Sequence, residues 1–124
     1  MKFNLQNRLI DFTVQCCDLA ESLPKTRTGN HLADHFIRAG ISPSLNYSEA
    51  TRAESRNDFV HKMKICIKEL RETLVCMKII TLKKMHPDHE PIIKLMKEND
   101  ELVAIFHKSI TTAKSNTSSS IKVK

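Results

Sequence analysis

Residues 42–73 read SPSLNYSEATRAESRNDFVHKMKICIKELRET, and this stretch decides the fold. It joins the end of one amphipathic helix to the start of a long basic helix through a short polar junction. Ser55 and Asp58 fit a capping box, in which a hydroxyl caps the first turn and a carboxylate three residues later reaches back to the cap amide. We therefore predict that Ser55 opens a helix that continues to about residue 84.

Apolar residues recur at spacings of three and four on both sides of this stretch, which predicts three further helices. The first covers about residues 4–22, and the last follows a turn at residues 86–91. The second begins near residue 30 and ends near residue 50. It contains Gly40 and Pro43, residues that normally interrupt a helix. Its apolar stripe keeps its phase across them, so we predict one kinked helix.

The composition also favours helices, because two glycines and four prolines in 124 residues leave little material for a hairpin-rich β fold. Four amphipathic helices joined by short turns predict an all-α protein with an antiparallel up-down-up-down bundle. We assign residues 1–113 to this four-helix bundle domain. The Ser-rich, polar residues 114–124 are predicted to form a disordered tail.

The net charge of +6 and the pI of about 9.3 describe a basic protein. This charge is compatible with nucleic acid, an anionic membrane or an acidic protein as partner. No apolar run approaches the roughly 20 residues that span a bilayer, and the N-terminus has no secretory signal. The four cysteines form no CxxC motif and are expected to be reduced core residues. We therefore expect a soluble, cytoplasmic protein with no membrane partner.

Placing residues at 100° intervals around the basic helix, with Met63 at the centre of its core face, gives two charged flanks. From residue 56 to residue 85, eight Lys and Arg face three acids, a net +5. The candidate nucleic-acid-binding residues on the basic flank are Lys64, Lys68, Arg71 and Lys78. The candidate oligomer-interface residues on the opposite flank are Asp58, Ile65, Glu69, Glu72, Cys76 and Ile79. Ile65, Cys76 and Ile79 are expected to face away from the core, which predicts self-association through a head-to-tail contact that closes a ring.

Several segments resemble the four-helix-bundle proteins encoded in 23S rRNA intervening sequences. Residues 42–50, SPSLNYSEA, resemble the S-x-P-x-N-x-x-E segment of that family, although Pro43 follows Ser42 directly here. Ser55-x-x-Asp58-Phe59 and Leu70-x-Glu72-Thr73 resemble its third-helix pattern. The resemblance implies a ring-shaped homopentamer. It also relates the chain to the accessory variability protein of diversity-generating retroelements, which implies nucleic acid and a reverse transcriptase as possible partners.

Other polar residues have structural explanations as well as functional ones. Asn46 and Glu49 form either a recognition pair or a structural pair near the kink, where Asn46 satisfies backbone or fixes the bundle register. His31 and His35 are spaced like a metal-binding pair but also fit a solvated helix face. The ligand-rich run 86–90 could hold zinc, or it could simply start the last helix.

No catalytic arrangement is visible, and we expect no enzyme activity, metal or cofactor. Glu69 and Glu72 do not imitate a di-iron site, because no Glu-x-x-His motif occurs in the chain. The leading hypothesis is a non-enzymatic, ring-forming accessory factor that binds RNA or DNA through phosphates. The alternatives are an interaction scaffold whose charges serve only ring assembly, and a metal-dependent enzyme.

Overall fold

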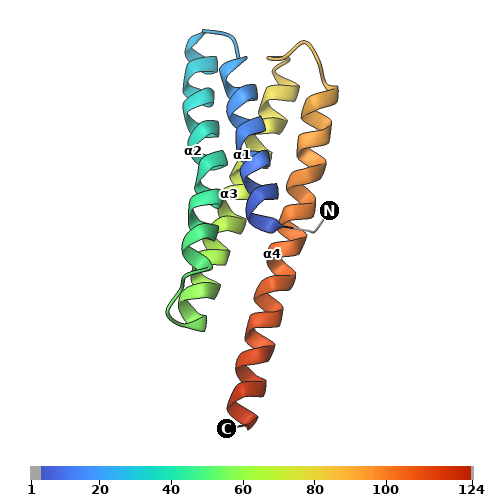
Figure 1. Ribbon diagram of the computed structural model, residues 1–124. Helices are drawn as coiled ribbons and strands as arrows, with labels where there is room; N and C mark the ends of the chain where they lie inside the picture. Colours follow the sequence, from blue (N-terminus) through green and yellow to red (C-terminus); the bar gives the residue numbers. More distant parts are fainter. Residues whose placement is uncertain (1–3, 124) are drawn as a thin grey trace.

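The computed structural model describes residues 4–123, with side chains described from residue 4 to residue 115. These residues form four helices: α1 (Leu5–Glu21), α2 (Arg27–Ala50), α3 (Arg56–Leu82) and α4 (Glu90–Val123). The helices alternate in direction, with each packed against its neighbours in sequence and α1 packed against α4 (Figure 1). The predicted all-helical, up-down-up-down arrangement is therefore confirmed.

Side-chain caps determine where the helices begin. Ser55 caps α3 as predicted, because its Oγ accepts a hydrogen bond from the amide of Asp58 at 3.1 Å. Thr26 caps α2 in the same way through the amide of Gly29, at 3.0 Å. This cap starts α2 at Arg27, a few residues earlier than the sequence predicts, because a capping threonine precedes the first apolar residue of the stripe.

Helix α2 continues through Pro43 to Ala50 as one element, as predicted. A proline inside a helix removes one backbone hydrogen bond. Side chains from both neighbouring helices bind the backbone around this point. The Thr13 hydroxyl of α1 donates to the carbonyl of Gly40 at 2.8 Å, and the Cys66 thiol of α3 donates to the carbonyl of Pro43 at 3.5 Å. Pro43 is therefore held between α1 and α3.

The core lies along the common axis of the helices. Its largest fully buried side chains include Leu9, Phe12, Phe36, Met63, Leu70, Met77, Ile80, Ile92, Leu102 and Phe106. Two polar residues, Thr73 and Asn99, are also fully buried, and Nδ2 of Asn99 donates to the carbonyl of Leu70 at 2.9 Å. The bond from Asn99 to Leu70 ties α4 to α3 at one level of the bundle and so fixes their relative register.

Helix α4 is longer than the other helices and projects past the turn between α2 and α3 (Figure 1). Its helical backbone runs to Val123 and so enters the segment that the sequence assigns to a disordered tail. Side chains from residue 116 onward and residue 124 lie outside the described residues. The proposed domain boundary at residue 113 stays a prediction.

The α1–α2 contact depends on Gly40. A Cβ added to Gly40 would lie 2.9 Å from the Cβ of Cys16, which cannot move away without moving α1. An alanine in an unobstructed helix stabilises by about 1 kcal/mol relative to glycine. We expect Gly40→Ala to reverse this sign and to lower the free energy of unfolding by about 1–3 kcal/mol, because the contact is overpacked.

Urea denaturation measures this change. Leu45→Ala, at a position of the same helix that is 60% exposed, is the control and should change the free energy of unfolding by less than about 0.5 kcal/mol. A Gly40→Ala variant at least as stable as the parent chain would show that the two helices do not approach this closely.

Candidate functional site

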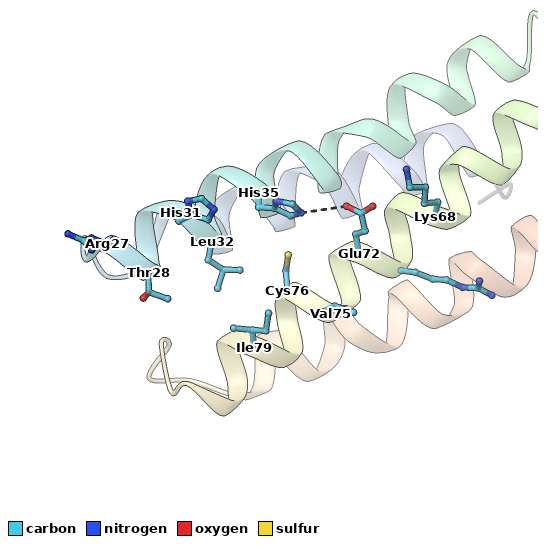
Figure 2. A pocket seen from close by; sticks show the side chains of 11 residues that line it. Arg27, Thr28, His31, Leu32, His35, Lys68, Glu72, Val75, Cys76 and Ile79 are labelled. Carbon is cyan, nitrogen blue, oxygen red and sulfur yellow. Dashed lines mark ion pairs between the residues drawn. The ribbon is translucent and has the colours of Figure 1, made fainter.

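A wide groove lies between α2 and α3. It has a volume of about 870 Å³ and runs between the N-terminal half of α2 and the C-terminal half of α3. We call it the α2–α3 groove. The residues that line it are Arg27, Thr28, His31, Leu32 and His35 of α2, and Lys68, Arg71, Glu72, Val75, Cys76 and Ile79 of α3. In Figure 2, Leu32 of α2 and Cys76 of α3 point into the space between the two helices, whereas Arg27 points away from it at the start of α2.

Apolar side chains line the groove between its charged edges. Leu32 and Cys76 are buried at 9% and 4% exposure, whereas Val75 and Ile79 are 54% and 41% exposed. Cys76 points from α3 towards α2 and lines the groove (Figure 2). The groove is therefore an open apolar surface with charged side chains at its edges.

The charges at the edges are mostly positive. Arg27 lies on one side, and Lys68 and Arg71 lie on the other. The single acid, Glu72, is directed across the groove to His35, with 3.6 Å between Glu72 Oε1 and His35 Nε2 (Figure 2). This contact is an ion pair only when His35 is protonated. The groove consequently presents an excess of positive charge around an apolar floor.

All four predicted nucleic-acid-binding residues are exposed. We call Lys64, Lys68, Arg71 and Lys78 the basic ridge. Lys64, Lys68 and Arg71 also line a smaller depression of about 250 Å³ between α3 and α4. In that depression, Arg71 Nη2 lies 3.2 Å from Nε2 of His107. Lys78 lines neither depression. The basic ridge therefore runs along α3, with Lys68 and Arg71 lining the depressions on both sides of it.

Two of the predicted oligomer-interface residues are not on the surface. Cys76 and Glu69 are only 4% and 8% exposed, so the prediction that Cys76 faces away from the core and the placement of Glu69 outside the core face are wrong. Both errors come from the assumption that the core face of α3 is centred on Met63. The buried residues of α3 include Thr73 and Ile80, and the arc that they form is centred nearer to Met77. Helix α3 packs against both α2 and α4, which widens this arc and turns it towards α2.

The remaining interface candidates have different environments. Asp58, Ile65 and Glu72 are half-buried, and Ile79 is exposed in the α2–α3 groove. The predicted flank is thus not one continuous outward surface. The sequence did not identify Arg27, Leu32 and Val75 as candidate site residues. A groove combines residues of two helices, and the sequence does not show the register of one helix against the other.

The predicted structural residues bind their own chain. Asn46 Nδ2 donates to the carbonyl and to the hydroxyl of Ser42, one turn earlier in α2, at 3.0 Å each. The carboxylate of Glu49 pairs with Lys62 at 2.6 Å, linking α2 to α3 across their turn and raising the pKa of Lys62. These contacts favour the structural explanation of the pair Asn46 and Glu49.

The histidine-containing segments do not assemble a metal centre in the described part of the chain. No group of three or more His, Cys, Asp or Glu side chains that could hold a metal occurs among the described residues. His31 and His35 are exposed at the edge of the α2–α3 groove. His86 and Asp88 instead organise the last turn, where Asp88 Oδ1 accepts the amide of Glu90 at 3.1 Å. No helix in the described part of the chain is long and apolar enough to cross a membrane.

These features define a four-helix bundle with an apolar, positively edged groove and a basic ridge. The chain belongs to the 23S rRNA-intervening sequence protein family, whose model matches residues 1–108. It is similar to the crystal structure of a protein with unknown function from the S23 ribosomal protein family of Bacteroides thetaiotaomicron. The two share 23% sequence identity and a TM-score of 0.77, over 86% of this chain and 98% of the other. The search of curated proteins found no match.

The burial of Cys76 can be checked through thiol reactivity. Burial raises the pKa of the Cys66 thiol to about 12 and also raises the pKa of Cys16 and Cys76. At a pH below its pKa, a thiol is mostly protonated, and little of the reactive thiolate is present. The pKa of Cys17 is raised as well, but Cys17 is half-buried whereas the other three thiols are buried, so we expect iodoacetamide at mildly alkaline pH to label Cys17 first and the other three slowly.

Mass spectrometry of peptides after short labelling times would give the order of reaction, with urea-unfolded protein as the control in which all four cysteines react. Labelling of Cys76 as fast as Cys17 would contradict its placement beneath the groove.

Proposed function

We propose that the protein is a non-enzymatic accessory factor that assembles into a ring-shaped homopentamer and binds RNA or DNA through the basic ridge. The observation that carries this proposal is the unneutralised charge of the ridge. Among the described residues, no ion pair involves Lys64, Lys68 or Lys78. Exposed cations spaced about one helical turn apart suit a phosphate backbone, and phosphate contacts dominate nucleic-acid affinity.

The acids of α3 support the proposal by their position. Glu69 is buried, Glu72 is directed towards His35 of α2, and Asp58 is half-buried in the first turn of α3. The positive charge of α3 is thereby separated from its negative charge. Repetition of the ridge in each copy of a ring would strengthen binding through multivalency.

The aromatic residues favour binding without sequence selectivity. Phe12, Phe36 and Phe106 are fully buried, and Tyr47 packs edge-on against Phe106 with 5.6 Å between the ring centroids. Readout of single-stranded bases commonly uses exposed aromatic rings as stacking platforms. The ridge offers cations without such a platform, which suits contacts to phosphates.

A second candidate function is an interaction scaffold whose charges serve ring assembly only. It is favoured by the position of Lys68 and Arg71, which line the apolar α2–α3 groove as well as belonging to the ridge. A reverse transcriptase is a candidate protein partner under either proposal, through the resemblance to the accessory variability protein. We propose that both roles belong to the cytoplasm.

Lys64 and Lys78 separate the two functions, because they belong to the basic ridge but do not line the α2–α3 groove. We expect the double variant Lys64→Glu/Lys78→Glu to bind a dye-labelled oligonucleotide more weakly. The slope of log affinity against log salt concentration should become shallower by about one for each phosphate contact removed. Fluorescence anisotropy over a salt series measures both quantities.

The matched control is Lys94→Glu/Lys97→Glu, which makes the same change of charge at exposed positions of α4. It should retain most of the salt slope. Affinity that is independent of salt, or equal losses in both double variants, would refute phosphate binding by the ridge and leave the scaffold function.

A further inference from the structure

The outward face of α1 combines exposed apolar side chains with carboxylates. Ile10 and Val14, one turn apart, are 44% and 51% exposed. The acids of α1, all of them exposed, are Asp11, Asp18 and Glu21. We call Ile10, Val14 and these three acids the acidic face of α1. Single exposed apolar residues are common, but a pair on one helix turn between acids forms a small amphipathic surface.

The cation of α1 is paired with acids of α4. The one basic residue between Leu5 and Glu21 is Arg8, which is turned away towards α4. Its guanidinium binds Glu98 at 2.6 Å and Glu101 at 2.7 Å. The strong pairing with Glu98 raises the pKa of Arg8 and keeps its charge on the α1–α4 side of the bundle.

We propose that the α2–α3 groove of one copy binds the acidic face of α1 of a second copy. This inference rests on the proposed assembly and names the two surfaces that form it. The apolar part of the groove, formed by Leu32, Val75 and Ile79, receives Ile10 and Val14. Arg27, Lys68 and Arg71 at its edges then lie beside the carboxylates of α1.

The two surfaces match in length as well as in charge. The groove follows α3 from Lys68 to Ile79, a separation of about 16 Å at 1.5 Å per residue. The acidic face of α1, from Ile10 to Glu21, has the same length by the same measure. An amphipathic helix placed in an apolar groove between two helices is a recurrent mode of protein recognition.

The position of the two surfaces makes the contact head-to-tail. Helices α1 and α3 lie across the diagonal of the bundle, so the outward face of α1 is separate from the α2–α3 groove (Figure 1). Each copy therefore offers one groove and one α1 face. Such a heterologous contact leaves an unused surface at each end until a ring closes.

The experiment places an aspartate in the middle of each surface. Val14→Asp should block the face of α1, Ile79→Asp should block the groove, and Ile93→Asp, at an exposed position of α4, is the control. All three positions are at least 41% exposed, so the fold should tolerate the charge, and circular dichroism would verify it. Sedimentation equilibrium at micromolar concentration should give an oligomer for the parent chain and for Ile93→Asp, and monomers for the other two variants.

An equimolar mixture of Val14→Asp and Ile79→Asp gives the decisive result. The Ile79→Asp chain keeps its α1 face and the Val14→Asp chain keeps its groove, so the mixture should form a dimer of one copy of each. That dimer cannot grow, because both of its remaining surfaces are blocked. A charge variant, Asp11→Lys/Asp18→Lys, should also be monomeric and adds no buried charge to the bundle.

Each contrary outcome is informative. An oligomeric Val14→Asp or Asp11→Lys/Asp18→Lys variant, or a mixture that stays monomeric, would overturn the pairing of these two surfaces while leaving the assembly itself intact. A monomeric parent chain would overturn the assembly and the pairing together. The salt dependence of nucleic-acid binding is measured separately at Lys64 and Lys78, so its failure is distinguishable from both.

Discussion

The passage of α2 through Pro43 is the constraint on which the rest of the bundle depends. Proline removes the hydrogen bond that residue 43 would donate to the carbonyl of Ala39. The helix nevertheless continues to Ala50, and side chains of both neighbouring helices bind the carbonyls of Gly40 and Pro43. The Ser44 hydroxyl lies 2.6 Å from that of Thr13, and since Thr13 already donates to Gly40, Ser44 is the donor of this second bond.

This arrangement explains why small and polar residues surround the proline. Gly40 allows α1 to approach, and the hydroxyls of Thr13 and Ser44 hydrogen-bond to each other at the same contact. On the other side, Cys66 of α3 binds the carbonyl of Pro43. A continuous α2 thus keeps α1 and α3 on fixed sides, and the N-terminal half of α2 forms one wall of the groove.

The elements of the fold could be predicted from the sequence because each depends on local chemistry. The cap at Ser55 and the unbroken phase of the stripe across Pro43 were sufficient for two of the helices. The rotation of α3 could not be predicted in the same way. Glu69 and Cys76 are buried because α3 packs against two partners at once, and a helical projection of one element contains no information about the width of that contact.

The same limit applies to the candidate site. The cations of the basic ridge were identified because charge on an exposed helix face is visible in the sequence. The groove could not be identified from the sequence, because Leu32 and Val75 belong to different helices and line one groove only through the register of α2 against α3. Val75 and Ile79, one turn apart and both exposed, were the available sequence signal for an open apolar surface on α3.

The distribution of charge connects the two proposed roles. Of the acids of α3, Glu69 is buried and Asp58 and Glu72 are half-buried, whereas the acids of α1 are all exposed. The exposed cations of α3 and the exposed acids of α1 thus lie on different helices of one small bundle. If the groove is filled by α1 of another copy, Lys68 and Arg71 are partly neutralised at that contact. Lys64 and Lys78 remain in water, because they do not line the groove. Assembly would then select which part of the ridge meets phosphate and would repeat that part once for each copy in the ring.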